Sequence, residues 1–296
     1  MQTGIRNSAI TALLDAGFEV IDFKKEDRGF LLNPLLKIKA VFDGPETRPL
    51  KRGGKEPDLS KAEAELMEII NRRRAGEIFD LSRVLVASDW RQAFRFARDF
   101  ASIGGGGAGD FIRVSFEVPE AEYQGVKFEK LVVNNAMVKI VEIDNGNIIF
   151  NFDDILFNSA INAKDTNDGG FDGSALACYL NNEFLNAMGI SDMLLANKND
   201  RKITLLTAHE LFGKREYWEE ETNFQKEPHQ MGCFKNEKNR VKSYEDETEW
   251  YWTSSARASS AAIFCRCGTS GYSSNHTASS VGGVAPAFCV AKATPL

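Results

Sequence analysis

Residues 250–290 read WYWTSSARASSAAIFCRCGTSGYSSNHTASSVGGVAPAFCV, and this stretch decides the fold. Large aromatic side chains open it at Trp250, Tyr251 and Trp252, and the mostly apolar string VAPAFC, residues 284–289, closes it. Side chains of these types are usually buried, so we expect both ends to belong to a hydrophobic framework. The residues between them are mostly small or polar, as on a protein surface.

The composition of this segment differs from that of the rest of the chain. From Ser254 to Ala291 there is no Lys, Glu, Gln, Met, Trp or Asp, although the chain is otherwise rich in Lys and Glu. A plain Ser/Gly linker would lack apolar residues such as Ile263, Phe264 and Tyr272, and it would not lead into a strand-like string. The break in composition therefore predicts a packed segment with one face that tolerates many residue types.

Three strings in this region resemble the C-terminal part of the variable proteins that are diversified by retroelements: YWTSS at 251–255, ASSAAIFC at 258–265 and ASSVGGVAPAF at 278–288. The resemblance covers roughly residues 81–290 and implies a C-type-lectin-type fold, which is related to the formylglycine-generating enzymes. In that family, copying errors at adenines turn template Asn codons into codons for many residues, but not for Lys, Glu, Gln, Met or Trp. All of these types are absent here.

The resemblance also implies a ligand-binding face at the positions where the family has template Asn. These positions, called the binding-face residues below, are Arg257, Ser260, Ile263, Arg266, Gly268, Tyr272, Ser274, Asn275, His276, Thr277 and Ser280. Tyr and Arg supply contact area and directional hydrogen bonds, while Ser, Gly and Asn adapt at little steric cost. The intervening residues would form the scaffold, namely Ala258, Ala261, Phe264, Cys265, Gly271, Ala278 and the string VAPAF.

Two of the binding-face residues conflict with a regular strand. Strict alternation places Ile263 and Arg266 on opposite faces, so we expect either a bulge that re-aims one of them or one that is not exposed.

An enzyme on the same fold is the alternative function. The formylglycine-generating relatives oxidise a substrate cysteine with their own cysteines, and Cys265 and Cys267 are spaced so that both point to one face of a strand. That spacing favours neither a disulfide nor, without a second pair of cysteines, a metal site. Cys267 occupies a position that is commonly Val in the similar sequences, and Cys265 and Cys289 lie in framework strings where a small buried residue suffices.

Other catalytic patterns are missing from the sequence. It contains no nucleophile elbow, Walker loop, dinucleotide fingerprint or paired-His motif. We therefore favour binding over catalysis and assign no catalytic residue, cofactor or metal. Calcium at the oxygen-rich cluster stays open, although its spacing does not match a calcium loop and Asx turns or helix capping explain most of it. The cluster consists of Asp153, Asp154, Asp165, Asn167, Asp168 and Asp172.

Overall composition limits the classes of partner. The 296 residues carry a net charge of −6, which argues against a general nucleic-acid partner because phosphate binding depends on Lys and Arg. No apolar run reaches membrane-spanning length, and the N-terminal residues lack the apolar core of a secretory signal. The odd number of cysteines fits reduced thiols. We expect synthesis in the cytoplasm and a place in a virion or an intracellular assembly, with a variable protein or cell-surface ligand as the partner.

The chain divides into three parts. Residues 1–58 combine a short helix over 7–16, strand-like apolar pieces and a charged Pro/Gly-rich run at 44–58, and we expect them to serve attachment or homo-oligomerisation. A connecting helix over 59–80 follows. Residues 81–296 are expected to form an α+β, C-type-lectin-like domain with the variable region at about 254–283.

Within that domain we expect antiparallel strands and two main helices. The helices lie over 89–102 and 174–188, the second ending at Gly189. Strands are expected at 81–88, 111–118, 127–133, 137–143 and 284–290, with a tight hairpin turn at Asn145-Gly146. A capping box of Thr207 and Glu210 predicts a short helix up to Gly213, and the charged residues 214–249 suit a long loop held by aromatic anchors.

Overall fold

The computed structural model describes residues 20–23, 28–33, 38–43, 48–49, 91, 94 and 107–291, the last without 215–217 and 219–221. By their contacts the residues separate into a unit of Met1–Asp110 with Ala293–Leu296 and a unit of Phe111–Lys292. The helices expected over 7–16 and 59–80 and the strand expected over 81–88 lie outside the described residues. Of the helix expected over 89–102, only Arg91 and Phe94 are described, and both are helical.

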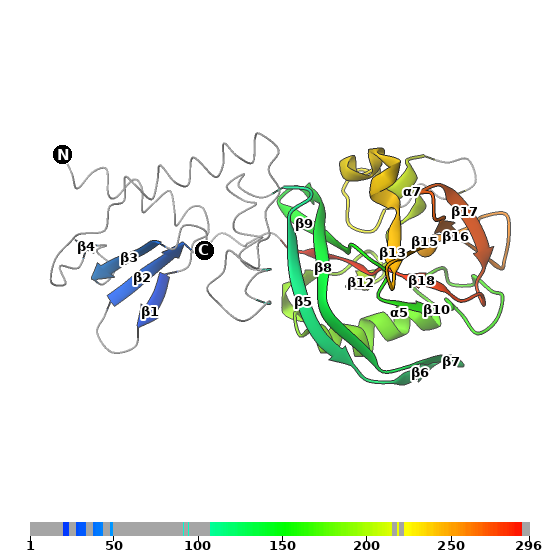
Figure 1. Ribbon diagram of the computed structural model, residues 1–296, viewed down its shortest axis with the longest axis horizontal. Coiled ribbons are helices and arrows are strands. Elements are labelled where there is room, and N and C mark those ends of the chain that lie inside the picture. The colour runs from blue at the N-terminus through cyan, green and yellow to red at the C-terminus, as the bar shows by residue number, and fades with distance from the viewer. Residues whose placement is uncertain are drawn as a thin grey trace. The chain divides into compact units, whose positions relative to one another are not determined.

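The first unit contains an antiparallel sheet. Its strands follow the order of the chain: β1 (Val20–Phe23), β2 (Arg28–Asn33), β3 (Ile38–Asp43) and β4 (Arg48–Pro49) (Figure 1). The apolar pieces of the sequence are therefore strands, and the break at Pro34 falls between β2 and β3.

The second unit is α+β and begins with a six-stranded antiparallel sheet. Its order is β11-β19-β9-β8-β5, with β12 also paired to β19. The hairpin turn between β8 and β9 lies at Asn145 (φ 52°) and Gly146 (φ 84°), as the sequence predicts. The bounds are β5 (Phe111–Val118), β8 (Leu131–Asp144), β9 (Asn147–Phe152), β11 (Leu194–Leu195), β12 (Ile203–Thr204) and β19 (Ala287–Val290).

The structure has strands in the regions expected at 127–133 and 137–143, but their bounds differ from the prediction. Residues 131–144 form one strand, β8, and Val126–Phe128 form β7, which pairs with β6 (Ala121–Tyr123). A bulge near Asn135, which adopts φ 52° and donates its backbone N–H to the Ser115 hydroxyl, lets β8 continue through the polar pair Asn134-Asn135.

A second sheet of five strands carries the C-terminal segment, in the order β10-β18-β15-β16-β17 (Figure 1). Its pairs are antiparallel except β15 with β18, which is parallel. The bounds are β10 (Phe157–Ser159), β15 (Tyr251–Ala256), β16 (Ile263–Cys267), β17 (Ser273–Thr277) and β18 (Gly282–Val284); a separate hairpin joins β13 (Lys242–Tyr244) and β14 (Glu247–Glu249).

The prediction of one continuous strand at 284–290 is wrong. It is two strands, β18 and β19, which belong to different sheets. The chain crosses between them at Ala285 and Pro286, whose carbonyls accept hydrogen bonds from the Asn151 side chain at 3.0 and 2.9 Å. Pro286 has no N–H for a ladder, so the strand breaks there.

The main helix runs over residues 175–188, as predicted. It consists of α5 (Ala175–Tyr179), a π-helical turn η2 (Leu180–Phe184) and α6 (Leu185–Met188). Ser174 caps its start by accepting from the Ala177 N–H, and Gly189 ends it at φ 61°.

The shorter helices follow their capping signals. The helix α7 (Ala208–Phe212) begins at the complete capping box of Thr207 and Glu210, as expected. Three 3-10 turns complete the unit: η3 (Ser191–Met193), η4 (Gly232–Lys235) and η5 (Glu237–Arg240).

Aromatic rings connect the main helix to the six-stranded sheet. Phe184 meets Phe152 edge-on at 5.9 Å, and Phe152 in turn contacts Phe288 at 6.3 Å. Phe150 stacks on Phe288 at 5.6 Å, and all four side chains are buried. The last strand is thus part of the centre of the core.

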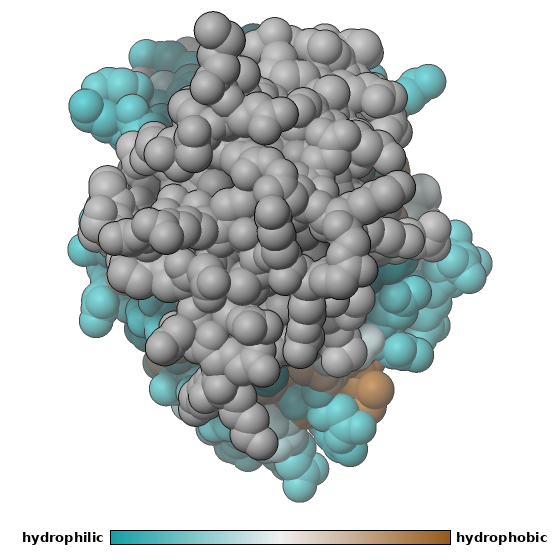
Figure 2. Space-filling model, turned by 90° about the vertical axis from the view of Figure 1, so that its left-hand side faces the viewer, coloured by the Kyte–Doolittle hydropathy of each residue, from teal (hydrophilic) through white to brown (hydrophobic). Residues whose placement is uncertain are grey.

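The described residues that are visible at the rim of Figure 2 are mostly polar. In the view from the left-hand side of Figure 1, the described residues at the rim are mostly hydrophilic, with a small hydrophobic patch at the lower edge (Figure 2). No helix within the described residues combines the length and the apolar character that a membrane span requires.

Replacing Phe288 tests this account of the core. Phe288→Ala should lower the free energy of unfolding by about 3–5 kcal/mol, because the site is fully buried between two aromatic rings. The matched control is Val281→Ala, since Val281 lies in the same segment but is 64% exposed and should change stability by about 0.5 kcal/mol or less. Chemical denaturation of both variants gives the comparison, and equal losses would contradict it.

Candidate ligand-binding face

The hairpin of β16 and β17 carries most of the binding-face residues. Its register pairs Phe264 with His276 and Arg266 with Ser274, so these four side chains share one face of the sheet. The pairs Ile263 with Thr277 and Cys265 with Asn275 lie on the other face. The binding-face residues of the hairpin are therefore divided between two faces at the free edge of the sheet, where β17 is the last strand.

The structure shows how Ile263 and Arg266 can both be exposed although alternation places them on opposite faces. The two residues lie on opposite faces, as alternation requires, and both are partly exposed. The register shifts in the pairing with β15, between Trp252 and Ala256, and not between β16 and β17. Neither a bulge in the hairpin nor burial of one residue is needed, because Ile263, at the first position of β16, and Arg266 each keep partial exposure on their own face.

Exposure separates the binding-face residues from most of the residues between them. None of the binding-face residues is buried, and Tyr272, Asn275 and His276 are exposed. The expected scaffold residues Phe264, Cys265, Gly271, Ala278 and the string VAPAF at 284–288 are buried. Ala258 and Ala261 differ, because both lie exposed in the loop between β15 and β16.

Neighbouring loops hold the turns of this surface in place. The Asn167 amide donates to the carbonyls of Ser260 and Ile263 at 2.6 and 3.3 Å. Asp165 accepts hydrogen bonds from the hydroxyl and the backbone N–H of Ser279, and these bonds lower the pKa of Asp165. The loop after β10 thus braces both ends of the segment that contains the β16–β17 hairpin.

A glycine fixes the turn at the tip of the hairpin. Gly268 donates to the Tyr272 carbonyl at 2.8 Å, and Gly271 adopts φ 80°. A Cβ atom at Gly271 would lie 2.4 Å from the Glu237 carbonyl oxygen, so this scaffold position accepts no other residue without movement of the backbone.

The oxygen-rich cluster noted in the sequence is dispersed in the fold. Asp153 pairs with Lys139 at 2.7 Å, Asp154 accepts from the Ser243 N–H, and Asp172 accepts from Asn197 and Asn199. Within the part of the chain that the structure describes, no three His, Cys, Asp or Glu residues are grouped so that they could hold a metal ion.

Trp250 is a surface residue that sequence reasoning assigned only to the framework. The Arg266 guanidinium lies 4.6 Å from the centre of its ring, and His276 stacks on it at 5.5 Å with an angle of 9° between the ring planes. Trp252 meets it edge-on at 4.9 Å. Gly282 makes room for the indole, because a Cβ there would lie 2.0 Å from Cη2 of Trp250. The alternation Trp-Tyr-Trp was the available signal, since residues two apart in extended backbone lie on the same face.

The ring nitrogens of His276 have separate roles. Nδ1 accepts from the Thr277 N–H at 3.1 Å and lies within hydrogen-bond distance of the Ser280 hydroxyl. This arrangement places the proton of the neutral ring on Nε2, a tautomer assigned from the hydrogen bonds. Because His276 is exposed, its Nε2–H is a donor available to a ligand.

The opposite side of the sheet faces a buried cluster that includes the cysteines. Cys265, Cys267 and Cys289 are all fully buried. Burial raises the pKa of Cys267, and it raises that of Cys289 to about 12, so both thiols are protonated at neutral pH. Next to them, burial lowers the pKa of Lys242 to about 8, although its ammonium group donates to the carbonyls of Phe152 and Asp153.

A polar cavity of about 250 Å³ lies at the other end of β15. Sequence reasoning did not predict it, because it is built from four loops that are distant in the chain. Its lining includes Asp172, Asn197, Asn199, Asn223 and Ser254. The Asp172 carboxylate already accepts hydrogen bonds from Asn197 and Asn199. Its negative charge is therefore stabilised by groups of the protein itself.

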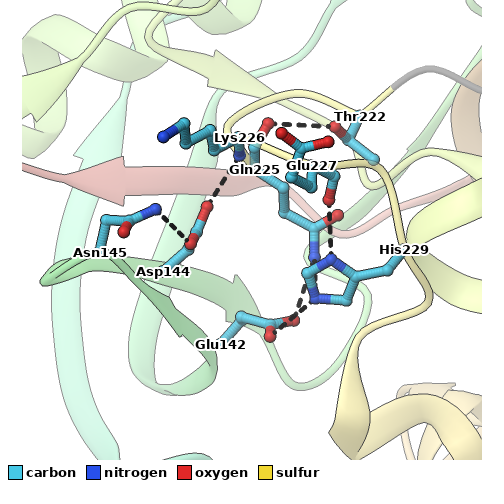
Figure 3. Close-up of polar contacts among 8 residues, drawn as sticks. All are labelled: Glu142, Asp144, Asn145, Thr222, Gln225, Lys226, Glu227 and His229. Atoms are coloured by element: carbon cyan, nitrogen blue, oxygen red, sulfur yellow. Dashed lines mark hydrogen bonds and ion pairs between the residues drawn. The ribbon is translucent and has the colours of Figure 1, made fainter.

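The long charged loop is anchored as expected by aromatic residues and also by a polar cluster. Trp218, Phe224, Phe234 and Tyr244 all pack with the hydrophobic cluster beneath the sheet. In the polar cluster, His229 Nε2 lies 3.1 Å from Glu142 Oε1, and the Glu227 carbonyl lies 2.8 Å from His229 Nδ1 (Figure 3).

The same cluster ties the loop to the β8–β9 hairpin at two further points. Gln225 donates to Glu142 at 3.1 Å, and the Lys226 N–H donates to Asp144 at 2.8 Å (Figure 3). The hydrogen bond with Glu142 is the main cause that raises the pKa of His229.

Replacement of Tyr272 and replacement of Phe264 should have very different effects on stability. Tyr272→Ala should change the free energy of unfolding by about 0.5 kcal/mol or less, because the side chain is 56% exposed. Phe264→Ala should cost about 3–5 kcal/mol, since Phe264 is fully buried. Thermal and chemical denaturation measure both, and a large loss at Tyr272 with none at Phe264 would mean that the faces of the hairpin are reversed.

The polar cluster around His229 should make stability depend on pH. Its pKa is raised in the folded state, so the stabilisation is fully present below the unfolded pKa, near 6.5, and is lost as pH rises through the folded pKa. The free energy of unfolding, relative to that of His229→Gln, should therefore fall as the pH rises above about 6.5. Denaturation at a series of pH values measures it, with Tyr272→Ala as the control whose difference stays constant. A constant difference for His229→Gln would contradict the role of the ion pair.

Comparison of the chain with protein-family models, with curated proteins and with solved structures finds no match in any of the three. The observations that bear on function are therefore the strings of residues 251–288 and the arrangement of the β16–β17 hairpin. That arrangement consists of a buried framework, a free sheet edge and accessible side chains at the binding-face residues.

Proposed function

We propose that this chain is a ligand-binding display protein whose C-terminal surface is diversified by a retroelement. The observation that carries the proposal is the separation of exposure along the hairpin: the binding-face residues are all accessible, whereas Phe264, Cys265, Gly271 and Ala278 between them are buried. Such a segment can change its surface without changing its core. The composition of residues 254–291, free of Lys, Glu, Gln, Met and Trp, supports the same reading.

The scaffold proposed is of the C-type-lectin type. An α+β unit with mostly antiparallel strands, a main helix and a long anchored loop before the last strands is compatible with it. Such a scaffold suits display, because the hairpin is held by the loop after β10 and by a framework that is itself buried. Rigid presentation lowers the conformational entropy lost on binding.

The remaining parts of the proposal concern the partner and the N-terminal residues. The partner would be a variable protein or a cell-surface ligand, recognised through Tyr, Arg and His side chains surrounded by small polar residues. Residues 1–58 would attach the protein to a virion or to an intracellular assembly, or would form oligomers.

A display library tests the function directly. The binding-face residues are randomised within the set of residue types that mutated Asn codons encode, and the full-length variants are sorted first for protease resistance and then for binding to an unrelated target such as lysozyme. Most variants should remain folded, because the altered side chains are accessible. Some of them should bind the target.

The control library carries the same residue types at an equal number of buried positions in the segment, and most of its members should be unfolded. Equal folding in the two libraries, or no binder from the first, would contradict the proposal.

The retroelement itself is tested by sequencing the DNA beside the gene, which should contain a reverse transcriptase and a near-copy of the segment. Neither would be present if the surface is not diversified in this way.

A further inference from the structure

Among the residues that the structure describes, none provides a hydrogen-bond acceptor to the Arg266 side chain. Among the described residues, no oxygen lies within hydrogen-bond distance of its guanidinium group and no carboxylate pairs with it; its only close partner is the ring of Trp250 at 4.6 Å. The Nε atom is buried and unpaired. A buried donor without an acceptor is costly, and more so when it is charged. The absence of an acceptor therefore needs an explanation.

Other arginines of the same unit have oxygen acceptors. Arg240 donates to the carbonyls of Phe234 and Gly271, and Arg201 donates twice to the Asp172 carbonyl. Arg113 and Arg257 donate to the Asn135 carbonyl and the Ser259 hydroxyl respectively. Within the described part of the unit, Arg266 therefore contacts the Trp250 ring but no oxygen acceptor.

Further donors lie around Arg266 on the same face of the sheet. Ser274 is directly opposite it in the β16–β17 register, and His276 stacks on the same indole ring. The Nδ1 atom of His276 is occupied by Thr277 and Ser280, so its exposed Nε2 carries the hydrogen. The site therefore presents a guanidinium, an imidazole N–H and a hydroxyl, with no acid among the described residues in contact with Arg266.

We propose that Arg266, stacked on Trp250, binds a carboxylate group of an acidic side chain on a protein partner. A guanidinium that lies over an aromatic ring keeps N–H groups along its own edge, where a planar carboxylate accepts two parallel hydrogen bonds. Because Nε is buried, the two Nη groups make this contact. His276 and Ser274 supply donors beside it.

The charge of the chain favours a single carboxylate over a polyanion. The net charge is −6, which disfavours the approach of a phosphate polymer, whereas one acidic side chain needs only the local cation. The aromatic and arginine pair is also typical of the residues that dominate binding energy at protein interfaces. This inference rests on the proposed function, because it specifies what the binding face recognises.

The test uses the full-length protein labelled with ¹⁵N and follows the Arg Nε–H and Trp indole N–H signals by NMR. The probes are sodium acetate and N-acetyl-glutamate amide, each compared with sodium chloride at equal ionic strength. Saturable shifts are expected at the Arg266 Nε–H and the Trp250 indole N–H with both carboxylates and not with chloride.

Variants assign the binding to the guanidinium. Arg266→Gln should abolish the saturable shift of Trp250, and Arg266→Lys should weaken it, because the charge remains but the planar fork is lost. Arg113→Gln is the matched control, since it removes an equal charge at a position outside the binding-face residues and should leave the shift intact. Dispersed indole signals in each variant verify that it is folded. If Arg266→Gln is unfolded, Arg266→Lys alone decides, because an undiminished shift in that variant excludes the fork.

Each other outcome overturns the inference. Equal shifts with chloride would mean screening only, and tighter saturation with sodium phosphate than with acetate would assign the site to phosphate. A failure of this inference is distinguishable from a failure of the proposed function. Binders from the display library without carboxylate binding at Arg266 would overturn the inference alone, whereas carboxylate binding without binders would leave an anion site on a protein that does not display a diversified surface.

Discussion

The fold depends on how one asparagine holds the place where the chain passes between its two main sheets. The Asn151 amide donates to the carbonyls of Ala285 and Pro286, which lie between β18 and β19 and have no ladder partners there. Leaving a buried carbonyl without a donor costs about 1–3 kcal/mol. The Phe152 N–H adds a third bond, to the Pro286 carbonyl at 3.0 Å. Through these contacts the strand that supports the hairpin is joined to the strand at the centre of the core.

Local signals in the sequence predicted the elements that are decided by local physics. Asn145-Gly146 has the positive φ angles of a tight hairpin, and the capping box of Thr207 and Glu210 starts a helix. Ser174 and Gly189 bound the main helix. In each case the residue that determines the structure is only a few positions from its partner, so one sequence is sufficient.

Features that depend on distant partners were missed or only partly predicted. The break at Pro286 is visible as a proline, but its assignment to two sheets depends on Asn151, which is remote in sequence. The polar cavity requires four separate loops. Alternation predicts that the binding-face residues divide between two faces, but no pattern within the hairpin reveals that β17 is the strand at the edge of the sheet. Tertiary pairing decides these features, and periodicity does not encode it.

The position of the last strands also has a consequence for synthesis. β18 lies between β10 and β15, and β19 lies between β11 and β9, so residues 282–290 complete the interior of both sheets. While the ribosome is still translating the β16–β17 hairpin, each sheet lacks an inner strand, and the unit can fold only after residues 282–290 emerge. A product that terminates before residue 282 would therefore expose unpaired strand edges and be open to proteolysis.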